Sequence, residues 1–394
     1  ENYSPILRKH GSSFVTLTFG LYAIATKGFL NGIRLFRHQA IAEMIHSLLK
    51  VVLVFIFVYL GFGILGAIFA YVLAPLVAFV FASIIIKRHL SKKRISKDIS
   101  NNHDLSKFQK NESKTINSFD KWTLIKFSLP ITFFYLLITL TTEMGILSVK
   151  SILMSNTLTG FYTSAVTLSR VTYSLFAALP MTMLPSISAA FAKRDFSLIK
   201  KYINQSMRYS MIILFPLTIV ISTNAKQIIS LIYSSQFIEA AASLSILVFG
   251  FTFLVIFMTQ CSFLQGINKP NLAMLFAFLA AGLAWLLNIT LIPKYGMFGA
   301  AIAMTLTALL SLIIISVYVY HKFKTLINFG SFLNITIASL IIYLVSLYWK
   351  LPGNYFMVSI FLLLILYLLL LVAFGEIKEE DKQLFFSILR VNRK

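Results

Sequence analysis

The chain has 394 residues, of which 58% are hydrophobic and 12% are charged, and its formal net charge is +22. Soluble domains are about one quarter charged, so this composition and a mean hydropathy of +0.84 exclude an ordinary soluble protein. A single cysteine excludes an intrachain disulfide and a cysteine-based metal site.

Long apolar runs occur along almost the whole chain. Each is about 20 residues long, which is enough to cross a hydrocarbon layer of about 30 Å as a helix. The runs do not alternate polar and apolar residues and are too long for barrel strands, so we predict an all-α, polytopic transmembrane bundle of about eleven helices. The predicted spans are 13–33, 41–60, 63–86, 124–148, 157–180, 208–224, 242–264, 271–292, 297–320, 331–348 and 355–374.

Three polar segments interrupt or follow these runs. Residues 87–121 are rich in Lys, Ser and Asn and predict a flexible cytoplasmic linker. Residues 188–207 alternate basic with aromatic and aliphatic side chains, which predicts an amphipathic helix in the membrane interface. The charged tail at 376–394 predicts a further short surface helix.

The 35 Lys and Arg residues are distributed unevenly among the loops. With the predicted spans, the loops on one side of the membrane carry roughly four times as many Lys and Arg residues as the loops on the other side. The positive-inside rule assigns the more basic side to the cytoplasm. We therefore predict a multi-pass protein of a bacterial or archaeal cytoplasmic membrane with a cytoplasmic C-terminus. The basic loops then face membrane lipid headgroups rather than nucleic acid.

A glycine pattern occurs twice. Gly32-Ile33-Arg34 is followed by Gly63-Ile64-Leu65-Gly66-Ala67-Ile68-Phe69-Ala70, and Gly266-Ile267-Asn268 is followed at nearly the same distance by Gly296-Met297-Phe298-Gly299-Ala300-Ala301-Ile302-Ala303. Short glycine and alanine patterns also recur by chance in membrane helices, because small residues favour close helix contact. Matched spacing and orientation favour a parallel internal repeat, which is typical of transporters.

The repeat divides the chain into parts. Residues 1–86 are predicted to hold the last three helices of a first six-helix lobe, and residues 122–320 a complete second lobe. Residues 321–394 add two helices and a cytoplasmic tail. Because three spans precede the second copy but not the first, we expect an N-terminally truncated chain, with three further helices before Glu1 and fourteen in all.

Ionisable residues inside spans are costly and mark functional sites. Glu43, His46 and Lys50 share one face of the second span, and Glu143 and Lys150 share a face of the fourth. These acids and lysines can also form structural pairs within one helix, Glu43 can cap its helix, and Lys150 can snorkel to the interface.

Two further cations fall in or near spans. Arg170 lies near mid-depth of the fifth span and stays charged, so we expect it to bind substrate or act in gating. Lys27, near the cytoplasmic end of the first span, can instead snorkel.

Signals of catalysis are sparse. No His, Asp and Glu cluster has metal-ligand spacing, and no phosphate-cradling glycine loop is present, so we predict no catalytic residue, no cofactor and no metal. A membrane enzyme of polysaccharide assembly would need a long outward loop or clustered His and carboxylates. A static structural subunit would not need duplicated lobes joined by a linker.

Four passages resemble the Wzx-type polysaccharide flippases (O-antigen or other lipid-linked oligosaccharide flippases) of the multidrug/oligosaccharidyl-lipid/polysaccharide (MOP) superfamily. They are Gly160-Phe161-Tyr162-Thr163-Ser164-Ala165, Leu184-Pro185-Ser186-Ile187-Ser188, Pro216 through Phe237, and Gln265-Gly266-Ile267-Asn268 with Asn288 and Pro293-Lys294-Tyr295-Gly296. The resemblance extends over nearly the whole chain, but its motifs are loose and mark the superfamily better than the substrate.

The resemblance implies a MATE/MOP-like fold of two lobes around an alternating-access cavity. The substrate would be an undecaprenyl-diphosphate-linked oligosaccharide for O-antigen, lipopolysaccharide or capsule, moved by a monomer that works beside a polysaccharide polymerase and glycosyltransferases. A diphosphate requires a cationic cavity in a low dielectric. The available cations are Arg170, Lys150, Lys50, Lys27 and Arg34. The coupling or gating candidates are Glu143, Glu43 and His46.

The alternative within transport is a cation-coupled multidrug exporter of the same fold. Such an exporter would favour acids inside the membrane, and this chain has two candidates, Glu43 and Glu143, against five bases. This balance favours an anionic substrate.

Overall fold

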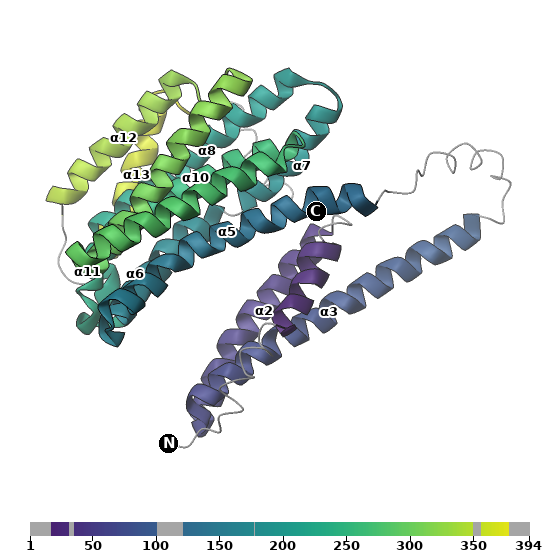
Figure 1. Cartoon of the computed structure of the whole chain (residues 1–394), viewed down its shortest axis with the longest axis horizontal. Helices are drawn as coiled ribbons and strands as arrows, with labels where there is room; N and C mark the ends of the chain where they lie inside the picture. Colours follow the sequence, from purple (N-terminus) through teal and green to yellow (C-terminus); the bar gives the residue numbers. More distant parts are fainter. Residues whose placement is uncertain (1–16, 31–34, 101–120, 177, 350–355, 378–394) are drawn as a thin grey trace. The chain divides into compact units, whose positions relative to one another are not determined.

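The computed structural model describes residues 17–30, 35–100, 121–176, 178–349 and 356–377 (Figure 1). Every regular element among these residues is a helix. Eight helices of the described part are long and apolar enough to cross a membrane. The chain is therefore an all-α, multi-pass membrane protein, as predicted.

The chain divides into two compact units, Glu1–Ser118 and Phe119–Lys394. The first unit contains a helix over 17–30 that ends in η1 (Ile24–Leu30), followed by further elements against which it packs. These elements are α2 (Phe36–Phe57), η2 (Val58–Phe62) and α3 (Gly63–Ser100). α3 continues through Ser100, so the first part of the predicted linker 87–121 is helical, because Lys, Arg and Leu are good helix formers.

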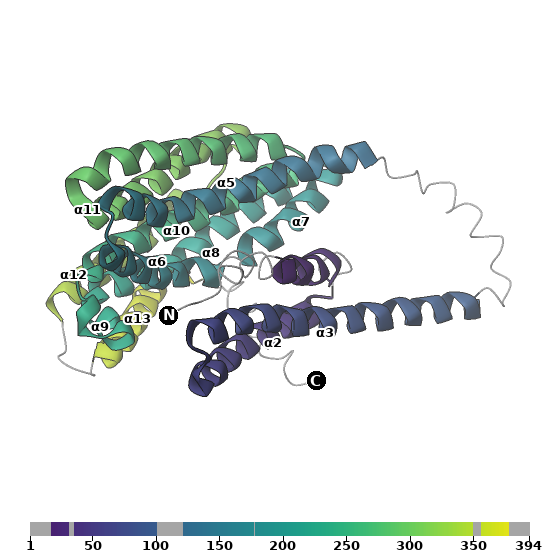
Figure 2. The ribbon, with the colours of Figure 1, turned by 60° about the horizontal axis from the view of Figure 1, so that its bottom comes forward.

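The second unit is a bundle built around α10, most of whose residues are buried (Figures 1 and 2). α10 packs against α6, α7, α8 and α11, while α5 lies along α11 and α12 lies along α8. The helices are α5 (Lys121–Leu153), α6 (Asn156–Phe176), α7 (Ala178–Ala192), α8 (Phe196–Thr223), α9 (Ala225–Tyr233), α10 (Ala240–Gly266), α11 (Pro270–Phe323), α12 (Phe329–Tyr348) and α13 (Phe356–Ala373), with the short η3 (Ser235–Phe237) before α10.

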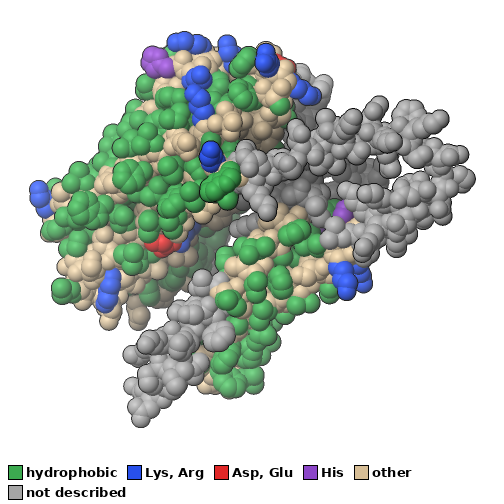
Figure 3. Space-filling view, turned by 45° about the vertical axis from the view of Figure 1, so that its right-hand side comes forward, with side chains coloured by type: hydrophobic (Ala, Val, Ile, Leu, Met, Phe, Trp, Pro, Cys, Tyr) green, Lys and Arg blue, Asp and Glu red, His purple; other side chains and the backbone are tan. Residues whose placement is uncertain are grey.

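The surface of the second unit is largely apolar. Large hydrophobic side chains are exposed along α12 and α13, for example Leu340 (55%) and Phe361 (65%). Figure 3 shows hydrophobic side chains covering the flank of this unit, with Lys and Arg gathered toward one end. A helix bundle with this outer surface is suited to lipid rather than water, since its helices satisfy their own backbone hydrogen bonds.

The duplicated glycines form the same turn in both units. Gly63 has φ 51° and ψ −132°, and Gly296 has φ 58° and ψ −142°. This left-handed region favours glycine, because a Cβ would clash with the backbone. At Gly296 the long helix α11 folds back, so its two halves correspond to the predicted spans 271–292 and 297–320 (Figure 1).

The second glycine of each copy lets the chain turn tightly. A Cβ on Gly66 would lie 2.7 Å from Cβ of Phe57, and a Cβ on Gly299 would lie 2.3 Å from the carbonyl oxygen of Leu291. Each glycine therefore touches the end of the preceding helix. The residues that follow are buried at equivalent positions, which are Ala70, Ala74, Ala78 and Ala82 in the first copy and Ala303, Thr307, Ser311 and Ile315 in the second.

One predicted boundary is wrong. The amphipathic helix expected over 188–207 is interrupted, since α7 ends at Ala192 and Arg194 is left-handed with φ 56°. Asp195 then starts α8 by accepting a hydrogen bond from the backbone N–H of Leu198 at 2.9 Å, which is a helix N-cap. The predicted span 157–180 falls on α6 and the first residues of α7, on either side of residue 177, which lies outside the described residues.

Candidate functional site

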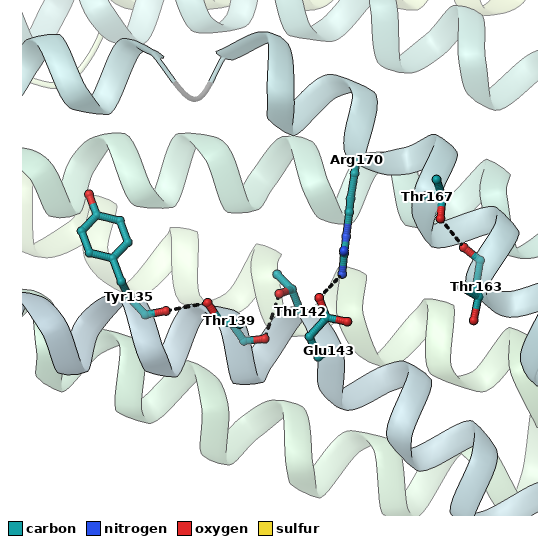
Figure 4. A network of polar contacts seen from close by, with 7 residues as sticks. All are labelled: Tyr135, Thr139, Thr142, Glu143, Thr163, Thr167 and Arg170. Atoms are coloured by element: carbon teal, nitrogen blue, oxygen red, sulfur yellow. Dashed lines mark hydrogen bonds and ion pairs between the residues drawn. The ribbon is translucent and has the colours of Figure 1, made fainter. Parts of the chain in front are cut away.

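The most informative polar site lies between α5 and α6. Nη2 of Arg170 on α6 donates to Oε1 of Glu143 on α5 at 2.6 Å. In Figure 4 the arginine side chain reaches from its own helix across to the glutamate, with threonines on both helices nearby. Residues 27 positions apart in sequence thus form one charge-assisted hydrogen bond, which is shorter and stronger than a neutral one.

A third helix contributes to the position of the guanidinium. Cζ of Arg170 lies 5.9 Å from the centre of the Phe251 ring on α10, which is within the range of a cation–π contact. Tyr173, one turn along α6, packs edge-on against the same ring at 6.5 Å. Glu143 and Phe251 therefore hold the arginine head group between them.

The pair lies deep along its helices and is still accessible. Arg170 is fourteen residues into α6, or ~21 Å from the start of that helix at 1.5 Å per residue. The side chains of Arg170 and Glu143 are 36% and 41% exposed. Glu143 lies well inside α5, one of the eight helices long and apolar enough to cross a membrane, whereas α6 is not among the eight. A charge inside such a helix must face protein or a water-filled space, because lipid solvates charge poorly. This face of α5 and α6 is therefore a candidate wall of a solvated cavity.

The remaining sequence candidates of this unit behave differently from the expectation. Nζ of Lys150 donates to Oδ1 of Asn156 at the connection between α5 and α6, and Glu143 pairs with Arg170 instead. The alternative of a structural Glu143–Lys150 pair within α5 is therefore not formed. The physical reason is distance, since residues seven apart on a helix are separated by about 10 Å along its axis.

The candidates of the first unit lie near aromatic rings. The His46 ring stacks on Tyr22, with centroids 4.8 Å apart, and Nζ of Lys50 lies 5.5 Å from the Tyr71 ring centre. Glu43 accepts a hydrogen bond from Gln39 at 3.3 Å. No Glu43–Lys50 ion pair is present within the described part of this unit, for the same reason of axial distance.

Two candidates cannot be placed. Arg34 lies outside the described residues, and Lys27 is described only through the backbone of η1. Among the residues that the structure does describe, no group of three or more His, Cys, Asp and Glu side chains could hold a metal ion.

Sequence reasoning missed a second ion pair. Nε of Arg208 on α8 lies 2.6 Å from Oε1 of Glu376, which follows α13, and a second guanidinium nitrogen donates to the Glu376 carbonyl. The two side chains are 5% and 3% exposed. The residues are 168 positions apart, so no local spacing signals their contact.

Sequence comparison gives partial matches to two families. Residues 3–191 match the model of a family described as polysaccharide biosynthesis protein, and residues 130–290 match the model of the MatE family. Each match covers less than half of the chain. The chain is thus similar to both families, and the two matched segments overlap over residues 130–191.

Three curated proteins illustrate this similarity. An uncharacterised membrane protein of Methanocaldococcus jannaschii is 36% identical over 94 residues, covering 24% of this chain and 18% of that protein. The probable low-salt glycan biosynthesis flippase Agl15 of Haloferax volcanii is 26% identical over 160 residues, covering 41% and 34%. The lipid II flippase MurJ of Bacillus subtilis is 25% identical over 162 residues, covering 39% and 30%. The matches thus span at most about a third of the length of these relatives.

Solved structures establish the fold. Lipid II flippase MurJ in an inward closed conformation superposes with a TM-score of 0.63 at 17% identity, covering 90% of this chain and 71% of that one. A MATE transporter in the straight conformation gives a TM-score of 0.59 at 16% identity, covering 81% and 76%. The predicted MATE/MOP-like fold class is therefore confirmed.

Proposed function

We propose that this protein is a flippase that moves a lipid-linked oligosaccharide across the cytoplasmic membrane by alternating access. The observation that carries the proposal is Arg170, a permanent cation held deep in a membrane bundle yet 36% exposed. Glu143 neutralises it in the structure described here. A cation that is accessible at such depth fits a substrate that brings its own negative charge.

The chemistry of a phosphate-bearing lipid matches this site. A guanidinium presents parallel N–H groups that suit phosphate oxygens, and its attraction for an anion is much stronger in a low dielectric than in water. Glu143 would hold Arg170 while the site is empty, and a phosphate or diphosphate would replace it. The phosphate would then cross the membrane without an unpaired charge.

The sequence matches support the same class of substrate. The chain is similar to a polysaccharide-biosynthesis family, to a probable glycan flippase and to a lipid II flippase. On this basis we propose a Wzx-type flippase whose substrate is carried on undecaprenyl diphosphate. We further propose that its C-terminus is cytoplasmic and that it works beside a polymerase and glycosyltransferases. Lys150 in the second unit and Lys50 in the first unit are further candidate cations for an anionic substrate.

A drug exporter of the same fold is the second candidate. The MatE match and the carboxylate of Glu143 favour it, because an accessible acid can bind a cationic drug or a coupling ion. Arg170 weighs against it, since the guanidinium already neutralises that acid at 2.6 Å.

The test is genetic and uses the full-length gene. Deleting it should abolish surface polysaccharide and cause lipid-linked repeat units to accumulate, and the intact gene should restore both. A gene carrying Arg170→Gln should fail to restore them, whereas Arg194→Gln, at an exposed turn, should succeed. Normal polysaccharide output after deletion, combined with increased drug sensitivity, would instead favour the exporter.

A further inference from the structure

Hydroxyl side chains line the faces of α5 and α6 that lead to Arg170. On α5, Thr132, Thr139 and Thr142 recur at intervals that keep them near one face of the helix, and on α6 Thr159, Thr163 and Thr167 do the same. None of the six is buried. Figure 4 shows four of them, Thr139, Thr142, Thr163 and Thr167, around the Arg170–Glu143 pair.

Every one of these hydroxyls donates its proton to its own helix. Thr139 donates to the Tyr135 carbonyl at 2.9 Å, and Thr142 to the Thr139 carbonyl at 2.9 Å. On α6, Thr163 donates to the Thr159 carbonyl at 2.7 Å, and Thr167 to the Thr163 carbonyl at 2.8 Å. The outermost members follow the same pattern, with Thr132 bonded to the Ser128 carbonyl and Thr159 to the Ser155 carbonyl.

This arrangement fixes what the face can bind. A hydroxyl has one proton and two lone pairs, so an oxygen whose proton is committed to the backbone offers only acceptor sites outward. The two rows therefore present acceptors, and Arg170 presents donors at their meeting point. A complementary ligand carries many hydroxyl donors next to an anionic group, and a saccharide joined to phosphate has this chemistry.

The dimensions are adequate for an extended ligand. From Thr132 to Glu143 the row on α5 rises by eleven residues, which is ~16 Å. A second row of the same length runs along α6 from Thr159 to Arg170 on the other side of the ion pair, so acceptors lie on both sides of Arg170 along the helices (Figure 4). By contrast Thr141 is 2% exposed, because it lies on the side of α5 that packs into the bundle.

We infer that the threonine rows of α5 and α6 bind the sugar hydroxyls of the substrate while Arg170 binds its phosphate. The inference rests on the proposed flippase function and assigns specificity within it. Arg170 would recognise any phosphate-bearing lipid, whereas the threonines would distinguish a glycosylated lipid from a bare one.

The test measures binding of two lipids to the full-length protein in detergent by native mass spectrometry. The probes are undecaprenyl diphosphate carrying an N-acetylglucosamine-containing trisaccharide, and undecaprenyl diphosphate without sugar. The variant combines Thr139→Val, Thr163→Val and Thr167→Val, which keeps side-chain shape and removes the acceptors. The matched control is Thr336→Val on α12, whose hydroxyl also donates to its own helix and whose helix packs on α8 and α13.

Losing one hydrogen bond weakens binding about 2- to 10-fold, so the triple variant should bind the glycosylated lipid at least ten-fold more weakly. Its affinity for the bare lipid should change less than about two-fold, which also shows that the variant is folded. The corresponding triple Thr→Ser variant keeps the hydroxyls and should restore binding.

Three results are decisive against the inference. An unchanged affinity for the glycosylated lipid, or an equal loss for both lipids, overturns the saccharide assignment and leaves the flippase proposal standing if Arg170→Gln weakens both lipids. A failure of the triple Thr→Ser variant to restore binding overturns it as well. If the wild-type protein binds neither lipid, the proposed function itself fails.

Discussion

Nε of Arg208 lies 2.6 Å from Oε1 of Glu376, the same distance that separates Arg170 from Glu143. The two ion pairs differ in burial, since the Arg208 and Glu376 side chains are 5% and 3% exposed and those of Arg170 and Glu143 are 36% and 41% exposed. Because the Arg208–Glu376 pair is buried, it holds the segment after α13 against α8. Exposure leaves the second pair open to exchange its partner for a ligand.

Glu376→Gln should strongly destabilise the second unit. Removing one member of a buried pair leaves an uncompensated charge and typically costs about 3–5 kcal/mol. The melting temperature of the purified protein, followed by intrinsic fluorescence, should fall by several degrees. Glu143→Gln is the matched control, because an exposed pair contributes little, and equal melting temperatures for both variants would show that the buried pair is not structural.

Substitutions in the accessible pair should shift substrate affinity in opposite directions. Glu143→Gln removes the internal competitor of the anion, so the Kd for undecaprenyl diphosphate should fall by about 2- to 5-fold, in line with the strength of an exposed pair. Arg170→Gln should raise that Kd by ten-fold or more, and Arg170→Lys should give an intermediate value, because a lysine lacks the bidentate fork. Titration by native mass spectrometry measures all three. A higher Kd for Glu143→Gln would show that the acid positions the arginine rather than competing for it.

The duplicated turns predict matched effects of glycine substitution. Gly296→Ala forces a side chain into the left-handed region, at a cost of about 1–2 kcal/mol, and Gly63→Ala should act alike in the first unit. Gly299→Ala should be worse, because its Cβ would meet the Leu291 carbonyl at 2.3 Å. Gly282→Ala is the control in the same helix α11, since no atom lies within 4 Å of its Cβ, and it should be neutral or stabilising. Thermal unfolding ranks the four variants, and a stable Gly299→Ala protein would contradict this packing.

The cap of α8 predicts a dependence on pH. Hydrogen bonds from the Ser197 hydroxyl and the Leu198 backbone N–H hold the pKa of Asp195 below its ordinary value of 3.8. Because the folded pKa is lowered, the cap stabilises the protein above the unfolded pKa, and this contribution is lost as the pH falls through the folded value. Asp195→Ala should therefore lower the melting temperature at neutral pH, and the difference should shrink as the pH falls through the lowered pKa of Asp195. A difference that does not change with pH would mean that the charge of the carboxylate has no part in capping.

The sequence predicted the elements that depend on local pattern. Long apolar runs predicted the membrane helices, and the repeated glycines marked two turns that share the conformation of Gly63 and Gly296. Backbone rules act within a few residues, so spacing alone was informative. The break at Arg194 was missed because the alternation of basic and apolar residues over 188–207 was interpreted as one continuous helix. Asp195 precedes an apolar helix, which is a typical N-cap signal and could have indicated the break.

The contacts between helices could not be predicted in the same way. The sequence drew attention to Arg170 as a deep cation but suggested no partner for it, and Glu143 was considered only beside Lys150 on its own helix. The structure brings Arg170 to Glu143 across two helices and brings Arg208 to Glu376 across 168 residues. Such pairs depend on how helices pack, and helix packing depends on shapes that a single sequence does not display.

The orientation of α11 gives the sharpest test of the proposed topology. Its 54 residues would extend ~81 Å if straight, well beyond a hydrocarbon layer of about 30 Å, but the turn at Gly296 makes two crossings of it. Lys269 precedes the helix, Lys294 adjoins the turn and Lys322 lies in the last turn, and all three are exposed. Cysteines introduced at these sites can be probed against a silent background, because the native Cys261 is buried.

A membrane-impermeant maleimide added to intact cells should label Lys294→Cys. It should label Lys269→Cys and Lys322→Cys only after permeabilisation, since the proposed cytoplasmic side carries the basic loops. Labelling of Lys269→Cys and Lys322→Cys from opposite sides would show that α11 crosses once and would refute the turn. Labelling of both from outside would keep the turn and reverse the orientation, and the phosphate-bearing lipid would then have to enter this bundle from the other leaflet.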